Sequence, residues 1–312
     1  MRTAPAVLRL RRPTEDLVRV GASMIKTIKN HIGPGWHFRA RRLSRLRWLA
    51  KYRQMRRYNT DVSHRGRVAY VLLDPEIESF SYRVENTAEV IDGLAAALGQ
   101  PPGELAGYAA ETQTDPELNE LLARHLRWRL DVKRRPPLGH RLAWYLIVRA
   151  RKPEVVVETG IYLGLGSLVL LHALERNRRE GSPGELLSFD LLPGAGSAVR
   201  EAARGGWRRI IGSTHDVLLP ALEGRRVDML FHDTSQTEEN QRMEFEAALS
   251  HAAPSLLLLD AHGGISPTLQ AICAERNGAY HRVPLRSRDH IHPGVPITFG
   301  IFDREDGALR PK

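Results

Sequence analysis

Histidines and acids close two apolar runs in the second half of the chain. One run ends at His232 and Asp233, and another ends at Asp260 and is followed by His262. An imidazole titrates near neutral pH, so His232 or His262, with Asp233 beside it, is a candidate catalytic base for a substrate hydroxyl. Carboxylates at the ends of adjacent strands also suit a divalent cation such as magnesium, which makes Asp233 and Asp260 candidate metal ligands. A third interpretation is that Asp233 only orders its loop and that His262 is a solvated turn residue.

A glycine-rich turn earlier in the chain has the composition of a ligand-binding loop. It follows the apolar run Val155–Val157. Its candidate ligand-binding residues are an acid, three glycines and a serine: Glu158, Gly160, Gly164, Gly166 and Ser167. Glycine lets the backbone approach a ligand closely and adopt positive φ, and the helix expected from Ser167 onward would direct its N-terminus at that ligand. The sequence therefore predicts a strand that turns over a nucleotide-like ligand, with a purely structural turn as the alternative.

The spacing of later residues narrows the class of ligand. Asp190 ends the next apolar segment, 24 positions after Gly166, where a carboxylate can bind both hydroxyls of a ribose. The dinucleotide fingerprint G-x-G-x-x-G is not met, because Val169 stands where its third glycine is required. The pattern thus favours a nucleoside cofactor over a nicotinamide or flavin dinucleotide.

The order of the expected elements indicates an α/β fold. Strands are expected near residues 154–158, 185–190, 207–212, 227–232 and 255–260, with helical patterns between most of them. This alternation predicts a Rossmann-like, doubly wound sheet that is mostly parallel. Tyr280–Leu285 and Ile297–Phe302 are expected to close it as an antiparallel C-terminal hairpin. A mainly helical N-terminal region precedes the sheet, with helices at Thr14–His31, Trp36–Tyr58, Thr87–Leu98 and Pro116–Arg129, the last capped by Asp115.

Charge divides the chain more sharply than the overall balance of +10 suggests. Residues 1–67 hold 18 Lys and Arg against three acids, a balance of +15, so the remainder carries −5. Three segments follow: a basic, partly helical or disordered arm at 1–67, a lid or dimerisation segment at 68–136, and a ligand-binding domain at 137–312. The arm suits contact with nucleic acid or anionic lipid, although a solvated extension is the favoured interpretation.

Cysteine content and hydropathy limit the cellular compartments in which the protein is expected. Cys273 is the single cysteine, which excludes an internal disulfide framework and a multi-cysteine zinc site. No run approaches the roughly 18 apolar residues of a membrane span, and the N-terminus lacks the pattern of a signal peptide. These features predict a cytoplasmic protein without a transmembrane segment.

The glycine turn and its context resemble motif I of the class I S-adenosylmethionine-dependent methyltransferases, E/D-x-G-x-x-x-G-x-G/S. The resemblance covers about residues 137–303. It implies that the loop holds the methionine part of S-adenosylmethionine and that Asp190 holds its ribose. It also implies contact with adenine near Ser213 and Thr214, where an acid is usual at position 213. A plain helix N-cap at Ser213 or Thr214 is an equal alternative.

The segment after His232 resembles a subgroup of small-molecule O-methyltransferases that includes macrolide-sugar enzymes, with the motif H-D-S-x-H-T-Y-E. Four positions match, namely His232, Asp233, Thr237 and Glu239. Thr234 replaces the serine, while Gln236 and Glu238 replace the second histidine and the tyrosine. If the second histidine is the base in the relatives, this chain lacks it.

Together these patterns predict a methyltransferase that O-methylates a small-molecule hydroxyl with S-adenosylmethionine as donor, helped by positioning and deprotonation. Asp233 is counted with the cofactor-binding residues as well as with the catalytic ones. Two alternatives remain: a nucleic-acid methyltransferase that uses the basic arm, and a non-catalytic cofactor-binding scaffold. For residues 68–136 the resemblance leaves a lid and a homodimer contact as two open alternatives.

Overall fold

The computed structural model describes residues 82–125, 137–162, 164–196, 199, 205–261, 266–288 and 294–303. The basic arm, the two helices expected within it and His262 lie outside these ranges. Within them, three parts determine how the candidate residues are placed: a central sheet, helices on its two faces, and an N-terminal helical segment.

The central sheet is built from β2 (Val155–Thr159), β3 (Glu185–Asp190), β4 (Trp207–Ile211), β5 (Val227–His232), β6 (Ala252–Asp260), β7 (Ala279–Val283) and β9 (Ile297–Asp303). Within the described ranges its strand order is β4-β3-β2-β5-β6-β9-β7. The first five strands in this order pair in parallel, and β9 runs antiparallel to both β6 and β7. The predicted doubly wound sheet with an antiparallel C-terminal hairpin is therefore confirmed.

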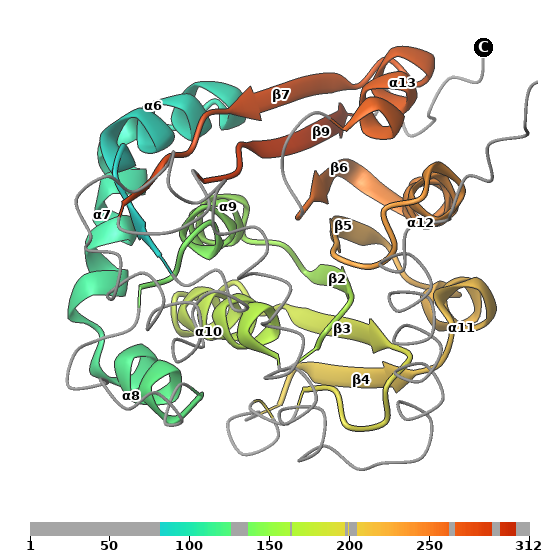
Figure 1. Ribbon diagram of the computed structural model, residues 1–312, viewed down its shortest axis with the longest axis horizontal. Helices are drawn as coiled ribbons and strands as arrows, with labels where there is room; N and C mark the ends of the chain where they lie inside the picture. The colour runs from blue at the N-terminus through green and yellow to red at the C-terminus, as the bar shows by residue number, and fades with distance from the viewer. Residues whose placement is uncertain are drawn as a thin grey trace, which may run out of the picture.

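Helices cover both faces of the sheet (Figure 1). One face carries α9 (Arg141–Arg151) and α10 (Leu165–Arg179), and the other carries α11 (Thr214–Leu222), α12 (Glu238–Ser250) and α13 (Pro267–Glu275). Alternate strand residues feed the two resulting cores: Val156 packs on the α9 and α10 side and Val157 on the α12 side. This two-sided burial explains why the strands read as continuous apolar runs.

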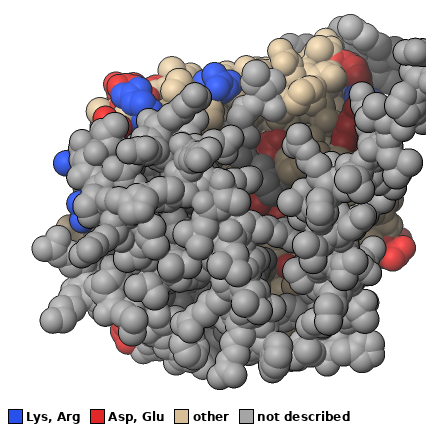
Figure 2. Space-filling model, in the orientation of Figure 1, with Lys and Arg blue, Asp and Glu red and all other residues tan. Residues whose placement is uncertain are grey.

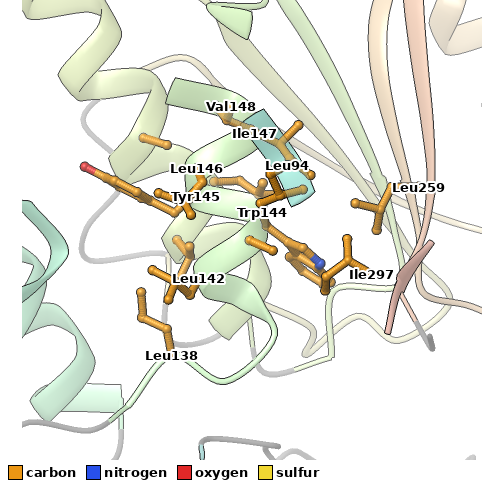
Figure 3. Packing of buried hydrophobic residues seen from close by; sticks show 14 of the residues in the cluster. Leu94, Leu138, Leu142, Trp144, Tyr145, Leu146, Ile147, Val148, Leu259 and Ile297 are labelled. Atoms are coloured by element: carbon orange, nitrogen blue, oxygen red, sulfur yellow. The ribbon is translucent and has the colours of Figure 1, made fainter. Parts of the chain in front are cut away.

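The helix α9 lies at the centre of the larger core (Figure 3). Nine of its residues, from Arg141 to Arg149, are buried, including Trp144 and Tyr145. Trp144 packs against Phe231 of β5 with ring centroids 5.3 Å apart, so the helix is tied directly to the strand that carries the candidate catalytic residues. Arg141, at the first turn of α9, is also buried with only 8% of its surface exposed.

The N-terminal segment consists of α6 (Thr87–Leu98), α7 (Pro102–Thr114) and α8 (Pro116–His125). The predicted cap of α8 is confirmed, since Asp115 accepts hydrogen bonds from the backbone of Glu117 and Leu118 at 2.9 and 3.2 Å. The helix α7 was not predicted, because its two glycines and few large apolar residues conceal its amphipathic pattern. Because side chains of α6, α7 and α8 belong to the same core as α9 and β6, this segment is part of the domain's packing.

A small sheet joins this segment to the far end of the chain. β1 (Arg83–Val84) pairs antiparallel with β8 (Ser287–Arg288), which follows β7. The side chain of Asn86 donates to the carbonyl of Pro284 and accepts from the backbone amide of Arg286, both just before β8. Glu89 of α6 forms an ion pair with Arg286 at 2.7 Å. On the face shown in Figure 2, basic and acidic side chains accordingly lie together at the upper left, over α6. No helix in the described ranges has the length and apolarity to cross a bilayer.

Candidate functional site

The ends of four adjacent strands bring most of the predicted residues to one edge of the sheet. Thr159 of β2 lies opposite His232 of β5, and His232 lies opposite Asp260 of β6. Asp190 ends β3 on the other side of β2. Since parallel strands share their carboxyl edge, residues from distant parts of the sequence meet there. His262 lies outside the described residues.

Gly160 is required by the protein's own packing. It has a φ of 91°, and a Cβ at this position would lie 2.1 Å from the carbonyl oxygen of Asp233. The exits of β2 and β5 can therefore approach each other only because residue 160 has no side chain. The amide of Asp233 also bonds to the carbonyl of Thr159 at 2.8 Å.

The other two glycines of the turn are similarly enclosed. Gly164, with a φ of 91°, is the N-cap of α10, and a Cβ there would lie 2.4 Å from a methyl carbon of Val199. A Cβ on Gly166 would lie 2.7 Å from Glu158 and 2.8 Å from Trp144. The three glycines thus let α10 begin close against β2 and α9, which shapes the turn that was predicted to bind a ligand.

Glu158 is a buried anchor beneath this turn. Only 2% of its surface is exposed, and one carboxylate oxygen accepts hydrogen bonds from the hydroxyls of Ser167 and Ser188. Burial raises the pKa of Glu158 to about 7, although these hydrogen bonds and the charge of Arg141 act to lower it. Glu158 and Ser167 therefore hold β2, β3 and α10 together below the glycine turn.

Asp190 orders the loops around it. Its Oδ2 accepts hydrogen bonds from the backbone of Ile161 and Tyr162 at 3.0 and 2.8 Å, and its Oδ1 accepts one from Leu192 at 2.8 Å. A carboxylate has about four acceptor positions, so these three bonds leave capacity for a hydroxyl donor. Asp190 is half-buried, which keeps that capacity accessible.

Ser213 and Thr214 begin α11. Ser213 is the N-cap residue, and its side chain makes no capping hydrogen bond. Thr214 is buried, and its hydroxyl donates to Glu244 at 2.7 Å. Of the two hydroxyls predicted to contact adenine, the one of Thr214 is therefore committed to the protein interior.

Glu244 of α12 is a functional candidate that the sequence analysis did not select. Its side chain is fully buried. It accepts hydrogen bonds from five side chains on two strands, one loop and two helices: Thr159, Thr214, His232, Thr234 and Asn240. Burial acts to raise the pKa of Glu244, but the hydrogen bonds and the charge interaction with His232 outweigh it and hold that pKa below its usual value. A visible signal was the row of polar residues at 240, 241 and 244, on the face of α12 that packs against the sheet.

His232 lies between Glu244 and Gln236. It is fully buried, its Nδ1 lies 2.8 Å from Glu244 Oε2, and its Nε2 lies 3.1 Å from the side-chain nitrogen of Gln236. The structure thus surrounds this predicted catalytic residue with protein hydrogen-bond partners.

Asp233 and Asp260 close β5 and β6. Asp233 is half-buried, and burial raises its pKa to about 8, opposed by the charge of Arg141 and reinforced by nearby carboxylates that include Glu158 and Asp260. Asp260 is 5% exposed and accepts a hydrogen bond from Gln241 at 3.2 Å. Arg141, another residue that sequence analysis missed, is thus a buried positive charge close to the acids.

The described residues do not complete a metal site. Among them, no group of three or more His, Cys, Asp or Glu side chains has an arrangement that could hold a metal ion. The pair Asp233 and Asp260 therefore stays a two-residue prediction, and no catalytic step is assigned to a cation.

Comparison with known families identifies the central part of this architecture. The family model described as a methyltransferase domain matches residues 157–260. Residues 157–260 are a methyltransferase domain. The match runs from β2 to the end of β6 and includes every strand end described above. The prediction of a methyltransferase is confirmed.

Two solved O-methyltransferase structures are similar to part of the chain. The O-methyltransferase TomG from Streptomyces achromogenes, solved with SAM, is 17% identical, with a TM-score of 0.43 over 64% of this chain and 96% of that one. An O-methyltransferase from Bacillus cereus, solved with SAH, is 16% identical, with a TM-score of 0.45 over 64% of this chain and 97% of that one. No curated protein sequence matches the chain.

Proposed function

We propose that the methyltransferase transfers the methyl group of S-adenosylmethionine to a hydroxyl oxygen of a small molecule. The observation that carries this proposal is the meeting of Glu158, Asp190, Asp233 and Asp260 at one edge of a methyltransferase domain. A cofactor seat on the β2 and β3 side and a proton acceptor on the β5 side are what such a reaction needs.

The residues present fit the cofactor. Gly160 and Gly164 both take a φ of 91° in the turn, and Asp190 beside it retains capacity for the ribose hydroxyls. Leu191, which is 68% exposed, follows Asp190 directly, and Ile211, which is 36% exposed, pairs with Asp190 in the sheet. Both residues provide apolar surface for a flat base. S-adenosylmethionine, when bound, supplies a methyl group on a positively charged sulfur.

Asp233 is proposed to accept the proton of the acceptor hydroxyl. It is half-buried at the exit of β5, whereas His232 is fully buried behind it. A base is most effective when its pKa lies near the working pH, and burial brings the pKa of Asp233 to about 8. The hydroxyl proton passes to the carboxylate as the oxygen becomes the nucleophile. His262 remains the second candidate for this role.

Calorimetry with S-adenosylmethionine tests the proposal. We expect the wild type to bind and Gly164→Arg not to bind, because a side chain at residue 164 would collide with Val199. Gly103→Arg is the matched control, since a Cβ at residue 103 meets nothing within 4 Å. Thermal melting monitored by circular dichroism verifies that both variants fold. Absence of binding by the wild type would contradict the proposal.

The acceptor is identified by mass spectrometry of co-purified ligands, followed by a screen of hydroxyl compounds with and without magnesium. Transfer that is unaffected by EDTA would argue against a cation on Asp233 and Asp260. Binding of the donor without transfer to any acceptor would favour the scaffold alternative, which Gln236 and Ser213 motivate.

The basic arm supports one further candidate, a nucleic-acid acceptor. Its balance of +15 over residues 1–67 predicts RNA or DNA binding that weakens steeply with salt. Deletion of residues 1–67 should abolish that binding and leave donor binding intact. Light scattering of the same two proteins tests whether the protein forms a homodimer.

A further inference from the structure

A chain of hydrogen bonds connects the buried carboxylate of Glu244 to that of Asp260. Glu244 Oε2 lies 2.8 Å from His232 Nδ1, and His232 Nε2 lies 3.1 Å from Gln236 Nε2. Gln236 Oε1 then lies 2.9 Å from Gln241 Nε2, which lies 3.2 Å from Asp260 Oδ2. This chain of hydrogen bonds runs from α12 to the end of β5, and through Gln236 and Gln241 to the end of β6.

The two ends of the chain determine the direction of every bond in it. An ionised carboxylate only accepts hydrogen bonds, so His232 must carry its proton on Nδ1, facing Glu244. In the neutral ring Nε2 then accepts, and the amide group of Gln236 must donate to it. The oxygen of Gln236 consequently accepts from the amide group of Gln241, which also donates to Asp260.

The reverse orientation is excluded by the same reasoning. A doubly protonated His232 would require the oxygen of Gln236 at Nε2, which turns the amide group of Gln236 toward Gln241. Gln241 would then have to present its oxygen to Gln236 and therefore also to Asp260. Two acceptors would face each other in a buried site, which costs roughly 1–3 kcal/mol or more.

The links differ in how deeply they are buried. His232 and Glu244 have no exposed surface, and Gln241 and Asp260 are each 5% exposed. Gln236 is exposed. It occupies the position where the small-molecule O-methyltransferase pattern has its second histidine. In this protein, the solvent-accessible member of the hydrogen-bond chain is therefore an amide.

We propose that Glu244 is a positioning residue of the methyltransferase site, acting through His232, Gln236 and Gln241 to hold the carboxylate of Asp260 in one orientation. The assignment of Asp260 to the acceptor side rests on the proposed function. The chain itself is observed independently of that function. A glutamine at residue 236 can donate at one end and accept at the other, as the chain requires. A glutamate there can only accept.

Nuclear magnetic resonance of the full-length protein labelled at histidine nitrogens and aspartate Cγ tests this proposal. In the wild type the His232 signals should show a protonated Nδ1 and an unprotonated Nε2. The His232 and Asp260 signals are assigned by their absence from His232→Asn and Asp260→Asn. In the isosteric Gln236→Glu, the carboxylate can only accept, so Nε2 of His232 should become protonated. The Asp260 Cγ signal should shift as well.

Two further variants make the outcome decisive. Glu244→Gln should shift both signals, but this substitution alters a buried site. Gln236→Glu is therefore the variant that retains the fold, because residue 236 is exposed. Ser235→Ala, next to Gln236, is the control, since only the main chain of Ser235 contacts this cluster, and it should shift neither signal. A wild-type His232 protonated on Nε2, or an Asp260 signal unmoved by Gln236→Glu, would overturn the proposal.

Kinetics with the acceptor found in the screen separates positioning from folding. Gln236→Glu should lower kcat about 10–100-fold, the usual effect of altering a supporting hydrogen bond, while the Kd for S-adenosylmethionine stays unchanged. An unchanged kcat overturns the positioning role. If the wild type does not bind S-adenosylmethionine, the proposed function is contradicted, while the nuclear magnetic resonance experiment stays valid.

Discussion

Two buried glutamates on either side of the strand edge have opposite ionisation preferences. Glu158, below the glycine turn, has two hydroxyl donors, and its pKa is raised to about 7. Glu244, on the other side of β5, has five side-chain donors including a histidine, and its pKa is lowered. Both side chains are almost completely buried, so burial alone does not decide the charge. The number and kind of hydrogen-bond donors decide it.

The pH dependence of stability should differ in sign between the two sites. Between pH 4.5 and about 7, Glu158 holds a proton in the folded state that it has lost in the unfolded state, so its contribution to stability falls as the pH rises. Glu244 is ionised in the folded state below the pH at which it ionises when unfolded. Its contribution is therefore present above pH 4.5 and is lost as the pH falls.

Asp233 lies where the two regions meet, and its replacement should have the largest effect. Asp233→Asn should lower the rate of methyl transfer by about 10²–10⁴-fold, because the proposed proton acceptor is removed. The wild-type rate should rise with pH and level off above about 8, since only the carboxylate accepts a proton. Initial rates across pH 6–10 measure this.

The control for that prediction is Asp228→Asn. Asp228 lies on the same strand and bonds to the backbone of Val155 at the opposite edge of the sheet. Its variant should retain the wild-type rate. Equal rates for Asp233→Asn and wild type would remove Asp233 from the mechanism.

Truncation of Glu244 should cause the largest loss of stability. Glu244→Ala leaves the buried donors of five side chains without their carboxylate, and we expect the free energy of unfolding to fall by about 3–5 kcal/mol. Glu246→Ala, two residues later on α12, removes only partly exposed ion pairs with Arg242 and Arg276 and should cost less than about 1 kcal/mol. Urea unfolding of the two variants at pH 7 compares them. Similar losses would show that Glu244 is not a structural centre.

Glu158→Gln should remove the fall in stability between pH 4.5 and about 7. Wild-type stability should fall by on the order of 3 kcal/mol between pH 4.5 and about 7 through this group, and the variant should lack that fall. The charge of Glu158 also raises the pKa of Asp233, so the same variant should move the pH–rate profile to lower pH. Urea unfolding at several pH values and initial rates measure the two effects. Parallel stability curves for variant and wild type would contradict the raised pKa.

Removal of single hydroxyl groups should show the difference in charge between Glu158 and Glu244 as a small difference in the free energy of unfolding. At pH 6, Thr214→Val removes a hydrogen bond to an ionised Glu244 and should cost about 1.5–3 kcal/mol. Ser167→Ala removes one to a largely protonated Glu158 and should cost about 0.5–1.5 kcal/mol. Unfolding by urea at pH 6 measures both. A larger loss for Ser167→Ala would reverse the comparison.

The sequence predicted the sheet well because its signals are local. Each parallel strand is a short apolar run such as Val155–Val157, and Gly160, Gly164 and Gly166 mark one turn within seven residues. The helix expected from Ser167 onward is α10, which begins at Leu165. By contrast, α7 was missed because its glycines and alanines carry little pattern.

The candidate site was only partly predictable. Asp190, Asp233 and Asp260 were found because each closes an apolar run, and the rule that ligands bind at strand ends applies to all of them. Arg141 and Glu244 lie inside helices, where a charged residue usually faces solvent. Their burial could not be predicted without knowing which face of each helix the sheet covers.

By itself, then, the sequence determined the class of fold, the edge of the sheet at which the candidate residues lie and the methyltransferase match of the central domain. These depend on residue types and short spacings. The tertiary structure decided which acids are ionised and which side chains are committed to one another. It did so because Glu158 and Glu244 acquire their charges from hydroxyls and a histidine that lie up to 85 positions away in the sequence and meet them only when the sheet and helices have packed.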